Sequence, residues 1–84
     1  MPRIGVRLVD KIPRGFIGMN SKAARELGIK WKYGKNTVVV LKRLRGKSRR
    51  RVIKHEIEEL KLMRRGVRYR DAHRVANVLE KPRR

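Results

Sequence analysis

The N-terminal half of the chain holds two short stretches whose apolar pattern predicts β-strands. In residues 3–9, the apolar side chains of Ile4, Val6 and Leu8 alternate with their neighbours, which is typical of a strand with one buried face. Residues 37–41 read TVVVL, a β-branched run that is apolar on both faces and therefore predicts a central strand. Both strands are expected to belong to one small sheet.

A short helix is predicted between these strands. Residues 21–27 read SKAAREL, with alanines and a leucine forming a narrow apolar face. Either Asn20 or Ser21 can cap its first turn, because both side chains accept hydrogen bonds from free backbone N–H groups. Gly28 follows the last apolar residue and should end the helix.

Two further segments are expected to be irregular. Residues 11–19 contain a proline and two glycines, so they should form a loop that carries Phe16 and Ile17 inward. The segment KWKYGK interleaves Trp31 and Tyr33 with lysines. That arrangement would suit a surface on which nucleic-acid bases stack. We favour a core position for Trp31 instead, because so small a domain needs its only tryptophan for packing.

The longest helical pattern occupies the C-terminal part of the chain. Apolar side chains recur there at helical spacing, at Val52, Ile53, Ile57, Leu60 and Met63. Gly66 stands where a helix C-cap belongs, and Ser48 is a possible N-cap. A second apolar stripe follows at Tyr69, Ala72, Ala76 and Leu79. Two helices joined by a tight turn at Gly66 predict a helical hairpin.

The predicted fold class is α+β, with a small sheet and a short helix followed by the two-helix hairpin. We expect one compact domain over residues 1–84, with a β-rich part at 1–46, the hairpin at 47–81 and a basic tail at 82–84. Pro82 prevents the last helix from continuing into that tail. With only 84 residues the core must be thin.

Charge is the strongest compositional signal. The chain has 26 basic and 7 acidic residues, a formal net charge of +19 and an isoelectric point near 11.8. A compact body with this charge repels itself unless a polyanion neutralises it, and nucleic acid is the polyanion that such values favour. An anionic membrane is a weaker alternative, because the helices lack the wide Trp- and Phe-bearing face of interfacial helices.

Other compositional features limit the kinds of site and the cellular location that we expect for the protein. The chain has no cysteine, which excludes disulfides and thiolate zinc sites. No apolar run is long enough to span a bilayer and the N-terminus lacks a signal-peptide core, so an intracellular, cytoplasmic location without a membrane partner is expected.

A dense run of basic residues lies at 42–54, KRLRGKSRRRVIK. If Ser48 caps the helix, Arg49, Arg50 and Arg51 occupy its first turn, where the helix dipole disfavours cations. A bound phosphate would offset this unfavourable interaction, whereas solvent alone would not. The RNA-contacting residues that we expect are Lys42, Arg43, Arg45, Lys47, Arg49, Arg50, Arg51, Lys54, Arg64, Arg65, Arg68, Arg70, Arg83 and Arg84.

One constellation in the hairpin resembles a metal site. His55 and Glu59 lie one turn apart on the same helix face, and His73 follows Tyr69 by four residues on the second helix. With Glu56 as the base that deprotonates a bound water, His55, Glu59 and His73 would form a three-ligand zinc set. The structural alternative is a Glu59–His73 hydrogen bond that fixes the helix register, with Glu56 ion-paired to nearby cations. We favour that alternative from the sequence, and hence expect no metal, cofactor, catalytic residue or small-molecule substrate.

Size, charge and basic ends make the chain look like a small archaea-specific ribosomal protein, and the large subunit is the one we expect. That resemblance implies ribosomal RNA and neighbouring ribosomal proteins as partners. The expected function is then a structural, non-enzymatic one, in which the chain binds ribosomal RNA through phosphate and shape contacts. A free DNA- or chromatin-binding protein is an alternative.

A second resemblance covers about three quarters of the chain, from IGMNSKAARELGI to its end. The order of a capped helix, a GKNTVVV strand and RRVIKHEIEELKLMRRGVRYRDAH is similar to that of small archaeal and phage proteins with a metalloprotease-like His-Glu-x-x-Glu helix. In those proteins a Gly-x-x-Tyr-x-x-Ala-His segment follows, here Gly66, Tyr69, Ala72 and His73. This resemblance implies a small zinc hydrolase as the alternative function.

Overall fold

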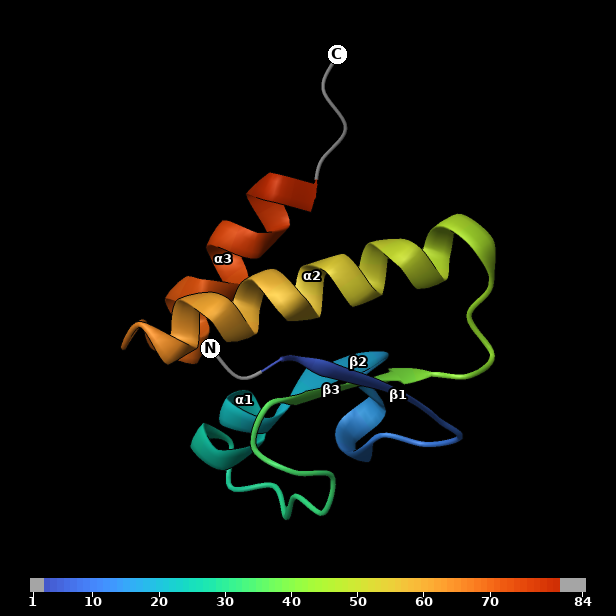
Figure 1. Cartoon of the computed structure of the whole chain (residues 1–84), viewed down its shortest axis with the longest axis horizontal. Helices are drawn as coiled ribbons and strands as arrows, with labels where there is room; N and C mark the ends of the chain where they lie inside the picture. Colours follow the sequence, from blue (N-terminus) through green and yellow to red (C-terminus); the bar gives the residue numbers. More distant parts are fainter. Residues whose placement is uncertain (1–2, 81–84) are drawn as a thin grey trace.

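The sheet of this protein has three strands in the order β1-β3-β2. The structure is a computed structural model that describes residues 3–80, except the side chains of residues 79 and 80 (Figure 1). Strand β3 (Thr37–Leu41) pairs in parallel with β1 (Gly5–Val9) and antiparallel with β2 (Gly18–Asn20). The α+β class, the central strand and the C-terminal pair of helices are therefore as the sequence predicts.

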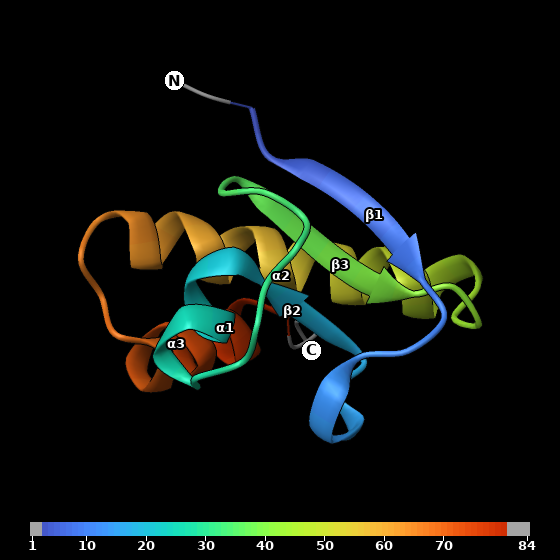
Figure 2. The same ribbon diagram turned by 90° about the horizontal axis from the view of Figure 1, so that it is seen from below.

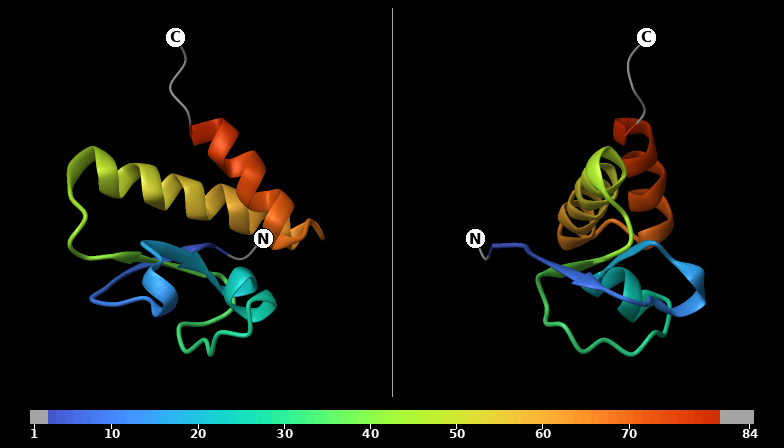
Figure 3. Two further views of the ribbon diagram at one scale, coloured as in Figure 1. Left: turned by 180° about the vertical axis from the view of Figure 1, so that it is seen from behind. Right: turned by 90° about the vertical axis from the view of Figure 1, so that its right-hand side faces the viewer.

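Helix α2 (Gly46–Arg64) lies across one face of the sheet and packs on β3 and β2. Helix α3 (Tyr69–Glu80) crosses α2 near the C-terminal end of α2 and then projects away from the sheet (Figures 1 and 3). Helix α1 (Ser21–Glu26) and the connection from α1 to β3 lie on the opposite side of the sheet. The sheet is thus the middle layer of the molecule.

The core includes two small clusters of buried side chains. On the side of the sheet that faces α1, the half-buried Phe16, Trp31 and Tyr33 pack against five buried residues. The second cluster, Ala23, Met63 and Ala72, joins α1 to both C-terminal helices. The three valine side chains of β3 are at most 1% exposed, as expected for a central strand.

Strand β1 differs from its predicted half-buried state. Val6 is 41% exposed and Leu8 is 39% exposed, because β1 is the outer strand of the sheet and α2 packs on the two strands beyond it (Figure 2). The loop predicted at 11–19 is also partly wrong. It contains a 3₁₀ turn (Pro13–Gly15) and the start of β2, and Ile17 is 44% exposed instead of turned inward.

The helix ends follow the predicted signals with one exception. Asn20 is the N-cap of α1, since its side chain accepts a 2.8 Å hydrogen bond from the Ala23 N–H. Gly66, with φ of 99°, directly follows the last residues of α2 and bonds back to Met63 O at 3.0 Å. The predicted cap at Ser48 is wrong, because α2 begins at Gly46 with Arg45 in the N-cap position. The hairpin accordingly starts one residue before the predicted boundary.

Among residues 3–80, the helices are too short or too polar to cross a membrane. The predicted tail at 82–84 lies outside the described residues, as does the side chain of Leu79.

Candidate metal centre

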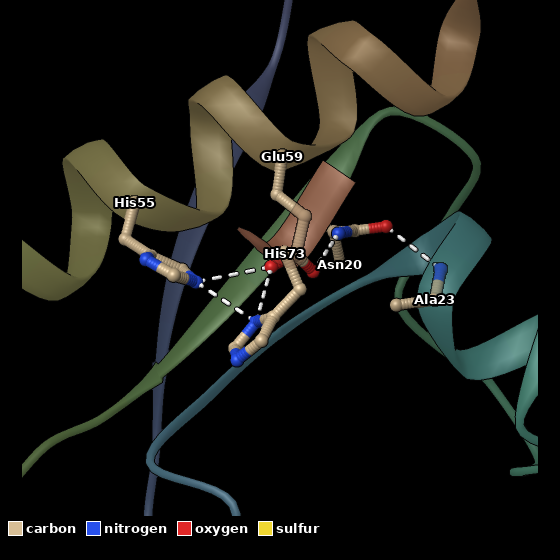
Figure 4. Close-up of polar contacts among 5 residues, drawn as sticks. All are labelled: Asn20, Ala23, His55, Glu59 and His73. Atoms are coloured by element: carbon tan, nitrogen blue, oxygen red, sulfur yellow. Dashed lines mark hydrogen bonds and ion pairs between the residues drawn. The ribbon is translucent and has the colours of Figure 1, made fainter. Parts of the chain in front are cut away.

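Helices α2 and α3 bring His55, Glu59 and His73 to one point (Figure 4). His55 Nε2 lies 3.0 Å from Glu59 Oε2, and His73 Nδ1 lies 3.0 Å from the same oxygen. The two ring nitrogens are 3.2 Å apart. His55 and Glu59 share a face because they are one turn apart on α2, whereas His73 arrives because α3 folds back over α2. The sequence-predicted candidates therefore converge.

Hydrogen bonds alone do not satisfy this triangle. Each ring nitrogen presents either one proton or one lone pair, and an ionised carboxylate presents lone pairs only. If both nitrogens of His55 and His73 are protonated here, two N–H groups face each other across 3.2 Å. If only one is protonated, a nitrogen lone pair faces the Glu59 lone pairs across 3.0 Å. A cation at the centre would accept all three lone pairs.

The spacing of these atoms also suits a common cation. Zinc binds imidazole nitrogen and carboxylate oxygen at about 2.0–2.1 Å, which places tetrahedral neighbours about 3.3–3.4 Å apart. The observed separations of 3.0–3.2 Å are close to that value. His55 is 8% exposed and Glu59 is 1% exposed, but the His73 side chain is 44% exposed. The triangle is thus buried on one side and open on the other, as in catalytic zinc sites.

The remaining oxygen of Glu59 is held by a fully buried side chain. Asn20 donates from Nδ2 to Glu59 Oε1 at 2.9 Å, while its Oδ1 accepts from the Ala23 N–H. One amide therefore caps α1 and orients the carboxylate of α2 (Figure 4). Partners of this kind fix the direction of metal-ligating carboxylates.

A pocket of about 170 Å³ adjoins the triangle. Its walls are mostly apolar and come from the segment before β2, from α1 and from both C-terminal helices. Glu56 lines this pocket beside the three converging residues and is 6% exposed. The sequence left Glu56 either as an ion-pair partner of nearby cations or as the base beside a metal, and the structure buries it next to the candidate ligands.

Strand β2 comes unusually close to α2 at this pocket. A Cβ atom on Gly18 would lie 2.6 Å from Val52 Cγ1 and 2.9 Å from Glu56 Cγ, which is closer than van der Waals contact permits. Only glycine at this position lets β2 approach α2 while the Glu56 side chain keeps its place. The close approach thereby sets the position of the Glu56 carboxylate.

Tyr69, the first residue of α3, supplies a phenol to the same pocket. Its ring lies 5.4 Å from that of His73. Burial, followed by the negative charges of Glu59 and Glu56, raises the pKa of Tyr69 to about 12. The phenol therefore remains protonated and able to donate a hydrogen bond near neutral pH.

Three contributors to this centre were not predicted as such. Asn20 was expected only as a helix cap and Gly18 only as a loop residue. Tyr69 was expected on an apolar stripe and in the Gly-x-x-Tyr-x-x-Ala-His segment, but without a role of its own. Asn20 and Gly18 act through contacts with an element distant in sequence, so no local pattern signals their part in the centre.

Replacement of Asn20 by Asp tests whether this amide supports Glu59. Aspartate caps helices as well as asparagine does, but it offers no N–H and places a second carboxylate against Glu59. We expect N20D to lower the free energy of unfolding by about 1–3 kcal/mol, the usual cost of an unsatisfied buried polar group. Urea unfolding at neutral pH measures the change. Wild-type stability in N20D would show that the Asn20–Glu59 hydrogen bond contributes nothing.

The basic residues predicted to contact RNA differ in how far their side chains are exposed. Arg49 is half-buried, and its guanidinium donates to the carbonyl oxygens of Leu44 and Lys42 at 2.9 and 3.0 Å, which ties the turn before α2 to the helix. Arg64 is also half-buried. Arg83 and Arg84 lie outside the described residues. The others are exposed, namely Lys42, Arg43, Arg45, Lys47, Arg50, Arg51, Lys54, Arg65, Arg68 and Arg70.

Comparison of the chain with protein-family models, curated proteins and solved structures finds no match.

Proposed function

We propose that this protein is a small zinc-dependent hydrolase whose metal ligands are His55, Glu59 and His73. The observation that carries the proposal is the convergence of three lone-pair donors within 3.0–3.2 Å of one another at the wall of a pocket. Two imidazoles and one carboxylate form a ligand set that zinc accepts and that leaves a fourth position for water or substrate.

The surrounding side chains have the properties that hydrolysis requires. The cation would supply a Lewis acid and lower the pKa of its water. Glu56, buried beside the ligands, would take up the proton from that water as a general base. The protonated phenol of Tyr69 would donate to negative charge that develops on the substrate. The apolar pocket walls would limit access of bulk water to these groups.

The competing explanation is a purely structural one. A hydrogen bond from His73 to Glu59 would attach α3 to α2 without any metal, as the sequence first suggested. That explanation leaves one side of the triangle without a favourable interaction, either the 3.2 Å approach of the two ring nitrogens or one of the 3.0 Å nitrogen–carboxylate contacts. Metal content separates the two explanations directly.

The test is zinc binding by protein purified without a histidine tag. We expect one equivalent of tightly held zinc by elemental analysis. At free zinc 100-fold above the dissociation constant, binding adds about 2.7 kcal/mol of stability. For a domain of this size the melting temperature should then rise by about 10–20 °C. Thermal melts with and without zinc measure this shift.

Two variants make the zinc test specific. His73→Ala removes the most exposed ligand with little loss of packing and should abolish both the bound zinc and the shift in melting temperature. Glu58→Gln removes a carboxylate of the same helix that pairs with Lys61 at 4.0 Å and lies outside the triangle, and this variant should retain both. Substoichiometric zinc in the wild type, with no shift on addition of zinc, would overturn the proposal in favour of the structural pair.

We propose RNA binding, in association with the ribosome, as a second function. The observation in its favour is the distribution of charge. Of the seven acidic residues, Glu56 and Glu59 are buried in the candidate metal centre, so the surface is even more basic than the composition suggests. Ribosomal RNA and neighbouring ribosomal proteins are the proposed partners. The two proposed functions are compatible if one metalloprotease-like scaffold also binds RNA.

RNA binding is tested by sedimentation and by salt dependence. The chain should co-sediment with ribosomal particles when a cell lysate is resolved on a sucrose gradient at low salt. Its affinity for structured RNA should fall log-linearly with salt concentration, because each neutralised phosphate releases counterions. Migration with the nucleoid would instead favour a chromatin protein, and a flat salt dependence would leave only the hydrolase.

A further inference from the structure

A second hollow, of about 770 Å³, lies between α1, the segment that leads to β3 and the C-terminal end of α2. It is distinct from the candidate metal centre, since the residues that line the two share no member. Four cationic side chains line it, and among its described lining residues there is no carboxylate. We call it the basic hollow and define it by Lys22, Arg25, Trp31, Lys35 and Arg64.

The cations of the basic hollow come from three separate elements. Lys22 and Arg25 lie on α1, Lys35 lies just before β3, and Arg64 is the last residue of α2. Convergence of like charges in a concave surface raises the local potential and attracts anions more strongly than a flat surface does. Its volume lies within the range of pockets that hold a small organic ligand.

An aromatic platform accompanies these charges. Trp31 is half-buried, with part of its side chain packed against the core cluster and part lining the hollow. Its indole N–H donates to Gly34 O at 2.6 Å, which fixes the ring. The ring of Tyr33 stands edge-on to it with centroids 5.2 Å apart, and Arg7 and Lys32 each lie 5.7 Å from the Tyr33 centroid. Aromatic rings and cations therefore alternate from the hollow towards β1.

We propose that the basic hollow binds a single-stranded segment of nucleic acid. The cations neutralise backbone phosphates, and a base stacks on the part of Trp31 that the core leaves uncovered. Every base has an aromatic face, so this combination binds single strands with little sequence preference. Phosphates alone would not require an ordered indole, and an apolar ligand would not require four cations.

This inference deepens the proposed RNA binding and rests on it for the class of ligand. It places the contact at a different surface from the basic run at 42–54. That run covers the segment before α2 and the N-terminal half of the helix, whereas the hollow lies at its C-terminal end. At 1.5 Å per residue, Arg64 is roughly 27 Å from the first residue of α2 and about 15 Å from Lys54. An RNA that presents both a helix and an unpaired strand can contact both ends.

Trp31 is the only tryptophan, so tryptophan fluorescence reports on this one side chain at the wall of the hollow. Titration of the zinc-treated full chain with a ten-nucleotide single-stranded RNA should quench this fluorescence in a saturable manner. A DNA strand of the same sequence should behave alike, because the phosphate and stacking chemistry is shared. Inorganic polyphosphate, which has charge but no bases, should bind more weakly and leave the fluorescence almost unchanged.

Charge removal locates the contact. The double variant Lys22→Ala with Lys35→Ala should weaken binding of the RNA strand about tenfold and reduce the salt slope by about 1.4, since each single-strand phosphate contact contributes about 0.7. The matched control, Lys11→Ala with Lys61→Ala, removes the same charge from exposed positions outside the hollow and should bind within about twofold of wild type. Thermal melts of both variants check that the fold is retained.

The alternative outcomes are distinguishable. Two results would show that the basic hollow is not the site of the single strand: binding without fluorescence quenching, or an equal loss of affinity in both double variants. Either result would leave RNA binding at 42–54 intact. Absence of binding to any RNA would overturn the RNA function as well. Poly-glutamate that quenches Trp31 as tightly as the RNA strand would replace the ligand class with an acidic polypeptide. Zinc content would be unaffected in each case.

Discussion

Exchange of Glu56 for Gln is expected to leave zinc in place and to lower the hydrolysis rate by about 10²–10⁴-fold, the usual contribution of a general base. Gln has nearly the same shape as Glu, so the contact with Gly18 and the burial of the side chain are retained. What is lost is the negative charge of the carboxylate and, with it, the ability to accept a proton at neutral pH. The effect should therefore appear in turnover and not in metal content or melting temperature.

The measurement uses generic chromogenic substrates, because the proposed hydrolysis does not specify which bond is cleaved. A casein derivative, p-nitrophenyl acetate and bis-p-nitrophenyl phosphate cover peptide, ester and phosphodiester bonds. For each substrate that the zinc-loaded wild type hydrolyses, the rate of E56Q is compared with that of E58Q, a neutral replacement two residues away. Equal loss in both would exclude a specific role for Glu56. Stoichiometric zinc without any hydrolysis would indicate a structural metal.

The elements that the sequence predicts well are those with a strong local pattern. Val38, Val39 and Val40 form an apolar run with no polar side, and they occupy the strand that lies between β1 and β2 in the sheet. The hairpin follows from helical spacing up to Met63 and from Gly66 at the turn. In each case residues within one or two turns determine the outcome.

Features that depend on distant parts of the chain were missed. Strand β2 has only three residues, and it exists because it pairs with β3. Whether Val6 and Leu8 are covered depends on where α2 crosses the sheet, which their own alternation cannot reveal. The start of α2 was misplaced because Ser48 is a common cap, whereas the Arg49 side chain instead secures the preceding turn through backbone carbonyls.

The candidate metal centre was likewise predictable only as far as local spacing along the helices determines it. The i, i+4 spacing of His55 and Glu59 requires that they share a face of α2, and the hairpin brings His73 within reach. The sequence could not distinguish a single Glu59–His73 bond from a three-sided cluster. That distinction depends on distances of a few tenths of an ångström set by the packing of α3 on α2.

The double exchange of Arg50 and Arg51 for Glu is expected to preserve the fold and to weaken RNA binding. Because α2 begins at Gly46, both residues lie in its second turn, where the helix dipole has little effect. Both are exposed and lie three or four residues from Lys47 and Lys54. Replacing these repulsive pairs with attractive ones should leave stability unchanged or raise it by about 0.2–0.5 kcal/mol per pair.

RNA binding should respond in the opposite direction, because two attractive contacts with phosphates become repulsive. We expect the affinity for structured RNA to fall roughly 10–100-fold at low salt and the salt slope to fall by about 1.8, or 0.9 for each duplex phosphate contact. The control reverses two other exposed charges, Lys11→Glu with Arg14→Glu, and so matches the change in net charge. If total charge alone governs binding, both double variants will lose affinity equally. If Arg50 and Arg51 stabilise the fold, their exchange will lower the melting temperature. A specific phosphate contact in the second turn of α2 requires that the first double variant melt normally and bind RNA more weakly than the control.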